Sequence, residues 1–143
     1  MSEAVASNPI YLLDSFALLA YLNNEPGKAR VEAVLALAEK RQCQALMCMI
    51  NLGEVLYNVE RRRGFAAAQR TLVLAESLPM TLLETTRALV LDAAHIKATY
   101  PLSYADAFAV AAALCQKATV LTGDPEFETI EQMVKVEWLA KKP

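Results

Sequence analysis

Short apolar runs that alternate with helical patterns are the feature of this 143-residue chain that most limits its fold. The runs are the expected strands: Ile10–Leu13, Ala45–Ile50, Met80–Leu83, Thr119–Thr122 and a fifth candidate at Val134–Leu139. The segments between them predict helices at Ser15–Leu22, Lys28–Lys40, Leu52–Arg63, Ala66–Ser77, Thr86–Thr99 and Tyr104–Lys117. Strands separated by helices or helix pairs favour an α/β domain with a mostly parallel sheet covered on both faces.

The length of the chain suits one domain with its own hydrophobic core. We expect residues 1–143 to form a single domain, with an ordered core over about residues 9–140. The longest unbroken apolar stretch, Ala107–Cys115, is too short to span a bilayer. Residues 1–8 lack the basic and apolar regions of a secretory signal. We therefore expect a cytoplasmic protein without a membrane segment.

The cysteines, the histidine and the net charge argue against several kinds of site. Cys43, Cys48 and Cys115 are odd in number and lack C-x-x-C spacing, so we expect buried free thiols rather than a zinc site or disulfides. His95 is the only histidine and no nucleophile elbow is present, so a structural histidine at the surface or half-buried is expected. The formal charge of −2 argues against a broad basic nucleic-acid surface, although a local one is compatible with it.

Four acidic residues stand in apolar or strand-end surroundings, where carboxylates are rare. They are Asp14, Glu54, Asp106 and Asp124. Asp14 and Asp124 follow expected strands, and Glu54 and Asp106 are expected to open helices. Ligands of parallel sheets bind beyond the carboxyl ends of the strands, in the crevice where the strand order reverses. Carboxylates that meet there repel one another unless a cation lies among them, so convergence of the four would make a divalent-metal site.

Each acid also has a plain structural interpretation as a helix cap or a first-turn acid. The matching patterns are Asp14 before the first expected helix, Asn51-x-x-Glu54, Ser103-x-x-Asp106 and Asp124-Pro125. For any one acid alone the cap is the simpler interpretation. A helix N-terminus also tolerates a clustered carboxylate, so one residue can both begin a helix and hold a metal. Glu126 could support such a pocket, but a first-turn acid after a proline needs no such role.

The motifs around these acids resemble those of a known family. The segments are Tyr11-Leu12-Leu13-Asp14-Ser15, Asn51-Leu52-Gly53-Glu54-Val55, Leu102-Ser103-Tyr104-Ala105-Asp106-Ala107 and Leu121-Thr122-Gly123-Asp124-Pro125-Glu126-Phe127. Together they resemble a PIN-domain ribonuclease of the VapC toxin type, in the family's order and over almost the whole chain. One departure is Asn51, where Ser or Thr is more usual; it changes the expected cap and leaves the acid intact.

The resemblance implies a three-layer α/β/α PIN-like fold with a five-stranded, mostly parallel sheet. It implies an acidic pocket formed by Asp14, Glu54, Asp106 and Asp124, with hydroxyl neighbours at Ser15, Ser103 and Thr122. Oxygen ligands suit Mg²⁺ or Mn²⁺, and the implied reaction is metal-dependent endonucleolytic hydrolysis of RNA phosphodiester bonds. Asp14 and Asp106 are expected as metal ligands. Glu54 and Asp124 are expected as ligands or as groups that orient the attacking water.

For partners, the resemblance implies a homodimer and a small VapB-like antitoxin that masks the active site and represses the shared operon. The sequence itself shows no partner. Two alternatives stay open: a PIN nuclease used in RNA processing without an antitoxin, and a non-catalytic PIN scaffold that binds RNA or protein. The presence of all four acids counts against the scaffold, because a degenerate pocket would be expected to lack some of them.

Other chemistries at a sheet edge lack their motifs. Neither G-x-x-x-x-G-K-[ST] nor G-x-G-x-x-G is present, and Phe16 stands where an Asp-x-Asp phosphatase would need a second acid. Contact with RNA phosphates is only weakly marked: Arg61-Arg62-Arg63 is the densest basic run, beside Lys28, Arg30 and Lys97. Cations in the last turn of a helix complement its dipole, so a solvent-facing role is the better interpretation of the arginine run.

Overall fold

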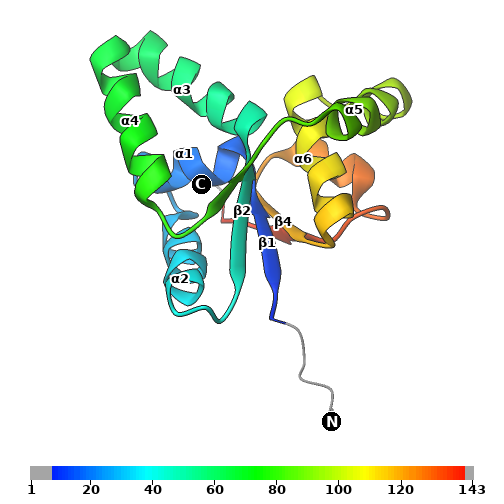
Figure 1. Ribbon diagram of the computed structural model, residues 1–143, viewed down its shortest axis with the longest axis horizontal. Coiled ribbons are helices and arrows are strands. Elements are labelled where there is room, and N and C mark those ends of the chain that lie inside the picture. Colours follow the sequence, from blue (N-terminus) through cyan, green and yellow to red (C-terminus); the bar gives the residue numbers. More distant parts are fainter. Residues whose placement is uncertain (1–7, 141–143) are drawn as a thin grey trace.

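The computed structural model of the chain describes residues 8–140, in which strands alternate with helices (Figure 1). The strands are β1 (Ile10–Leu13), β2 (Gln44–Cys48), β3 (Thr81–Leu83), β4 (Thr119–Thr122) and β5 (Val136–Trp138). The helices are α1 (Ser15–Leu22), α2 (Lys28–Glu39), α3 (Met49–Arg63), α4 (Phe65–Ser77), α5 (Arg87–Thr99), α6 (Tyr104–Gln116) and the 3₁₀ helix η1 (Pro125–Ile130). This is the alternation that the apolar runs predict.

The strands form one sheet with the order β3-β2-β1-β4-β5, and every neighbouring pair is parallel. β1 is the central strand, where Leu12 lies opposite Leu46 of β2 and Val120 of β4. The expected α/β fold with a five-stranded parallel sheet is confirmed. The chain adds β2 and β3 on one side of β1 and then β4 and β5 on the other, so the strand order reverses between β1 and β4.

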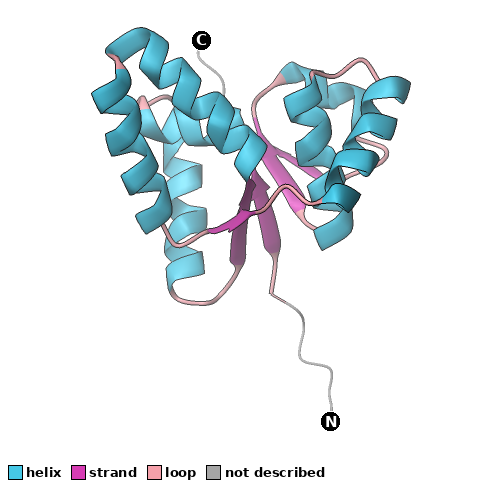
Figure 2. Cartoon of the chain, turned by 45° about the horizontal axis from the view of Figure 1, so that its top comes forward, coloured by secondary structure: helices cyan, strands magenta, loops and turns pink. Residues whose placement is uncertain are grey.

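Helices cover both faces of the sheet, and Figure 2 shows the strands between two groups of helices. Leu12 of β1 faces the core shared with α5, α6 and η1, whereas Leu13 faces α1 and α2. In β2, Leu46 points to the first side and Met47 packs with α3 and α4 on the second. Successive residues of a strand point to opposite faces, so burial on both faces explains why these strands are continuous apolar runs.

Two expectations about the start of α3 are wrong. β2 ends at Cys48 and α3 begins at Met49, three residues before the predicted start at Leu52. Asn51 therefore lies in the first turn of the helix rather than at its N-cap, and no side chain caps this end. The physical reason is that an unbroken apolar run fits the end of a buried strand and the start of a buried helix equally well.

The cysteines follow expectation only in part. Cys43 and Cys48 are buried free thiols, but Cys115 is exposed, because the last turn of α6 leaves the core after Ala113. His95 is exposed on α5, which agrees with a surface histidine. Within residues 8–140, every helix is too short or too polar to cross a membrane.

Candidate active site at the carboxyl ends of β1 and β4

The reversal of strand order between β1 and β4 fixes where the acidic residues can meet. Asp14 directly follows β1, and Asp124 follows β4 after one intervening glycine, so both lie beyond the carboxyl ends of adjacent strands. α1 begins at this edge with Ser15, and η1 begins there with Pro125. Two helix N-termini therefore direct backbone N–H groups towards the same space, where negative charge is stabilised.

All four acids named from the sequence line one cavity of about 300 Å³. Its acidic lining residues are Asp14, Glu54, Asp106, Asp124 and Glu126. The remaining described lining residues are Ser15, Phe16, Leu19, Asn58 and Ser103, none of which carries a positive charge. One of these acids follows β1, two lie in α3 and α6, and two follow β4, so they are far apart in the chain. Their roles as metal ligands stay a prediction at this point.

Asp14 is the most enclosed acid of the cavity, with 1% of its surface exposed. Its Oδ1 accepts a hydrogen bond of 2.9 Å from the backbone N–H of Ala17, so the residue caps α1 as its position predicts. Its Oδ2 accepts a 2.5 Å bond from the hydroxyl of Thr122 on the neighbouring strand. The same hydroxyl accepts the backbone N–H of Asp124 at 3.0 Å, which links the carboxyl ends of β1 and β4.

Glu54 reaches the cavity from inside α3 and not from its first turn, so the interpretation as a helix-opening acid is wrong. Its Oε1 accepts a hydrogen bond from the hydroxyl of Ser15 at the start of α1. One turn further along α3, Asn58 also lines the cavity and donates its side-chain N–H to the Glu54 carbonyl oxygen at 2.9 Å. A contact between α1 and α3 therefore holds this carboxylate at the cavity wall.

Asn51 takes part in the site through a contact that the capping pattern does not predict. Its Nδ2 donates to the carbonyl oxygen of Ala105 at 3.1 Å, and its Oδ1 is buried without a hydrogen-bond partner. Ala105 immediately precedes Asp106 in the first turn of α6. This bond therefore ties α3, which carries Glu54, to the part of α6 that carries Asp106.

Asp106 lies in the first turn of α6, where Ser103 is the N-cap. The Ser103 hydroxyl accepts the Asp106 backbone N–H at 3.1 Å, as the sequence predicts. In the expected capping box, Asp106 would also accept the Ser103 backbone N–H. That N–H instead donates to Glu126 Oε1 at 3.0 Å. The Asp106 carboxylate, on a side chain that is 5% exposed, is therefore free to point into the cavity.

Glu126 is the member of the site that sequence reasoning undervalued. Single carboxylate oxygens of Asp106, Asp124 and Glu126 lie within 4.8 Å of one another, close enough to share a cation. Asp124 caps η1 by accepting the Glu126 backbone N–H at 2.9 Å, which turns both side chains towards the same region. The available signal was the pair of acids around Pro125, but it does not show that η1 lies against Ser103.

The electrostatics of the cavity favour a bound cation. Burial raises the pKa of Asp14 to about 7, with a further rise from the charges of Asp124 and Glu54, although bonds from Thr122 and Ala17 oppose it. Burial also raises the pKa of Asp106 to about 9, and hydrogen bonding to Glu126 adds to the rise. The backbone N–H of Ser103 and the bond to Asp106 lower the pKa of Glu126. A cation among these oxygens would offset the cost of ionising the two buried acids.

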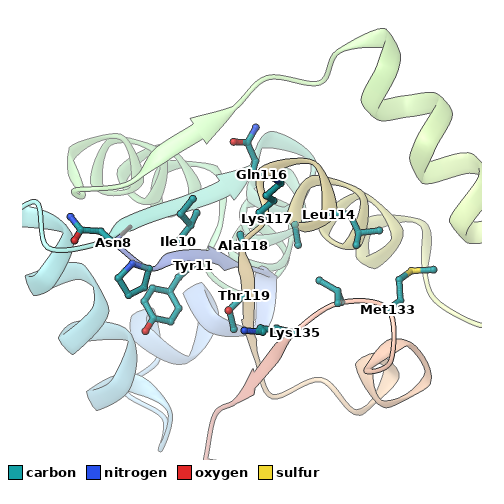
Figure 3. A pocket seen from close by; sticks show the side chains of 13 residues that line it. Asn8, Ile10, Tyr11, Leu114, Gln116, Lys117, Ala118, Thr119, Met133 and Lys135 are labelled. Atoms are coloured by element: carbon teal, nitrogen blue, oxygen red, sulfur yellow. The ribbon is translucent and has the colours of Figure 1, made fainter. Parts of the chain in front are cut away.

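The opposite edge of the sheet holds a larger cavity with a different lining. It measures about 690 Å³ and lies at the amino ends of the same two strands, between Tyr11, Thr119 and the end of α6 (Figure 3). Lys117 and Lys135 are its charged residues among the described lining, which contains no carboxylate. Size alone therefore does not identify the functional site.

Comparison with known proteins identifies the family. The family model described as PIN domain matches residues 11–132. The chain belongs to the PIN domain family. The match spans β1 through η1 and so contains every acid that lines the cavity. A search of the curated proteins gave no match.

Solved structures of toxin–antitoxin proteins share the fold of this PIN domain. A chain of the VapBC2 complex from Rickettsia felis, bound to a DNA fragment from its promoter, aligns with a TM-score of 0.74 and 18% identity over 92% of this chain and 99% of that chain. A toxin–antitoxin complex from Klebsiella pneumoniae gives 0.68 and 16%, over 92% and 99%. A VapC toxin from Mycobacterium tuberculosis, described as cleaving the sarcin-ricin loop, gives 0.67 and 18%, over 82% and 92%.

Proposed function

We propose that this PIN domain is a metal-dependent endoribonuclease and the toxin of a toxin–antitoxin pair. The observation that carries the proposal is the cavity at the reversal point of the sheet, where five carboxylates meet and no described lining residue is basic. Two of these carboxylates are buried, and their raised pKa values mark a site built to receive positive charge.

The donor set fits a hard divalent cation. All candidate ligands are carboxylate oxygens, which suit Mg²⁺ or Mn²⁺ better than a softer metal. Asp106, Asp124 and Glu126 would hold the ion, with Asp14 as a further ligand across the cavity. A bound ion of this kind supplies stabilisation of charge on a phosphate oxygen and a water of lowered pKa.

The protein side chains divide the remaining work by their positions. Thr122 holds one Asp14 oxygen, so the carboxylate keeps a fixed orientation towards the ion. Ser15 holds one oxygen of Glu54, so this carboxylate lies in the cavity lining, where its second oxygen could accept a proton from the attacking water. Asn58 lies beside Glu54 and offers an amide that can orient a phosphate oxygen. The placement of these groups around one cavity supports hydrolysis of a phosphodiester bond.

RNA as the substrate and an antitoxin as the partner follow from the family resemblance and the structural neighbours. One neighbour is described as a sarcin-ricin loop cleaving toxin, and others are toxin–antitoxin complexes. We therefore propose a VapB-like antitoxin for this chain, and we propose a homodimer on the family resemblance alone. Phosphate contacts outside the acidic cavity would come from a cation near its rim, such as Lys97, whose charge acts on Glu126.

The decisive experiment is cleavage of a mixed single-stranded RNA pool by the purified protein with Mg²⁺ or Mn²⁺ and again with EDTA. Asp106→Asn removes one charge at constant size and should lower the rate at least about 100-fold. The matched control is Asp92→Asn, which changes an exposed acid on α5 outside the acidic cavity. Equal cleavage by wild type and Asp106→Asn would refute the assigned site. No cleavage by either protein would favour a non-catalytic scaffold.

The toxin role needs a separate test. Expression of the wild-type chain should arrest bacterial growth, Asp106→Asn should not, and co-expression of a small reading frame adjacent to the gene should restore growth. Nuclease activity without growth arrest, together with no such neighbouring frame, would instead favour an RNA-processing nuclease.

A further inference from the structure

A second, apolar cavity of about 370 Å³ lies directly beside the acidic one. Its walls are mostly apolar: they are formed by Phe16 and Ala20 of α1, Glu25 and Pro26 of the following loop, Gly123 and Pro125 on either side of Asp124, and Ala140. Phe16 lines both cavities, so its ring is the wall that they share. A ligand held by the carboxylates therefore has an aromatic face next to it.

Gly123 leaves room for the Phe16 ring. A Cβ atom at position 123 would lie 2.3 Å from Cε1 and 2.5 Å from Cζ of the ring, which is far too close for any side chain. The glycine thus lets the ring lie against the backbone that leads into Asp124. Ala20, four residues after Phe16, lies on the same side of α1, and its small side chain leaves room beside the ring.

The chemistry of the substrate decides what this cavity can receive. Carboxylates and a cation bind the phosphate of a nucleotide, but they offer nothing to the flat, largely apolar faces of the bases on either side. Bases in single strands are bound by stacking on aromatic side chains, which tolerates any base sequence. The nearest aromatic face to the acidic cavity within its lining is that of Phe16.

We propose that the apolar cavity binds the nucleobase of a residue next to the cleaved bond, with the base against Phe16. The inference rests on the proposed ribonuclease function and adds to it a base subsite. It is favoured over a site for a partner's apolar side chain because only Phe16 separates the cavity from the acidic one, where the phosphate of the same nucleotide would bind. Phosphate at the carboxylates and base at Phe16 would be held together by one nucleotide.

The test pairs a change in the ring with removal of the base. The substrate is a short RNA containing one site mapped from the mixed pool, together with two versions that are abasic on either side of the bond. Phe16→Leu should lower kcat/KM on the intact RNA at least about fivefold, the lower end expected for loss of base stacking. On the RNA that lacks the bound base, Phe16→Leu and wild type should have the same kcat/KM. Phe16→Tyr keeps the ring and should stay within about twofold of wild type.

A control variant separates loss of base stacking from a general effect of removing an aromatic ring. Phe65→Leu changes an exposed aromatic residue on α4 outside both cavities and should behave as wild type. An equal loss by Phe16→Leu on intact and abasic RNA would overturn the proposal, because the ring would then act on the acidic site or on the fold. No loss on either RNA would also overturn it, and weaker binding of the antitoxin by this variant would mark a peptide site instead.

A binding measurement distinguishes failure of the nuclease proposal from failure of the base subsite. Intact and abasic RNA are titrated into Asp106→Asn and into the double variant Asp106→Asn/Phe16→Leu. Base-dependent binding that is lost in the double variant supports the subsite even if wild type cleaves nothing. Equal binding of both RNAs by both variants refutes it, whether or not wild type is a nuclease.

Discussion

The two ends of the β1–β4 pair carry opposite chemistry. At the carboxyl end, a cavity of about 300 Å³ gathers five carboxylates. At the amino end, a cavity of about 690 Å³ is lined by Lys117 and Lys135 and by no acid among its described residues. The same two strands make both, so strand sequence alone does not explain the difference.

The helices explain it. α6 begins at the carboxyl end, where Ser103 caps it and Asp106 stands in its first turn, and it ends at the amino end, where Lys117 is its C-cap. A helix has partial positive charge at its start and partial negative charge at its end. Acids are therefore stabilised where α6 begins, at the carboxyl edge, and cations where it ends, at the amino edge. The smaller cavity is thus the better metal site.

The strongest test of this comparison is the stability of Asp106→Asn without metal. The pKa of Asp106 is about 9 in the folded protein, above the ordinary value of 3.8 that applies to the unfolded chain. Above about pH 4 the unfolded state therefore loses a proton that the folded state keeps, so stability falls as the pH rises to about 9. Asparagine carries no such cost, and the variant should be more stable than wild type by on the order of 3 kcal/mol at pH 8.

Urea denaturation at pH 5 and pH 8 in EDTA measures this difference. The advantage of Asp106→Asn should shrink at pH 5, which lies only slightly above the ordinary pKa of 3.8, because the unfolded wild-type chain then gains little by releasing the proton that folded Asp106 keeps. Asp92→Asn, which changes an exposed acid, should show no comparable gain in stability. A constant advantage at both pH values would mean that packing, and not ionisation, distinguishes the variant.

Divalent ions should remove most of the stability difference between wild type and Asp106→Asn. An ion that binds only the folded state at 100 times its Kd stabilises by about 2.7 kcal/mol, or roughly 5–10 °C in Tm for a domain of this size. We expect this shift for wild type in Mg²⁺ or Mn²⁺, larger at pH 8 than at pH 6, because the ion competes with the protons on Asp14 and Asp106. Thermal melts with and without EDTA measure it.

The two edges can be compared in the same melts. Asp106→Asn should lose most of the shift, whereas Lys135→Gln, at the amino edge, should keep all of it. An unchanged shift in Asp106→Asn would place the ion elsewhere.

Most of the fold could be predicted from the sequence because each local pattern agrees with the global one. β1, which follows Pro9, and β4, which precedes Gly123, are short apolar runs. Every helix of the predicted set is present. The boundary between β2 and α3 was misplaced because Ala45–Leu52 is nearly all apolar apart from Asn51. There, tertiary contacts and not local pattern decide where the strand ends.

The site was predictable to the extent that its acids follow strands or caps. Asp14 and Asp124 were placed by the topology rule for parallel sheets, and Asp106 by its Ser103 cap. Glu54 was named but for a wrong reason, since it reaches the cavity from the second turn of α3. The part played by Glu126 depends on its bond to Ser103, 23 residues away in sequence, and no local pattern contains that contact.

The smallest expected effect concerns the amino edge, where the lining should matter for the fold and not for the reaction. Lys117 has φ +55° and ψ +44°, the left-handed conformation that favours glycine at the end of a helix. Lys117→Gly should therefore stabilise the protein by roughly 0.5–1 kcal/mol and leave RNA cleavage unchanged, as measured by urea denaturation and the cleavage assay. Lys135→Gln, which relieves no strain, should change neither the stability nor the rate of RNA cleavage. If instead either variant slowed cleavage several-fold, the amino edge would have to bind RNA, and the division of roles between the two ends of β1 and β4 would be wrong.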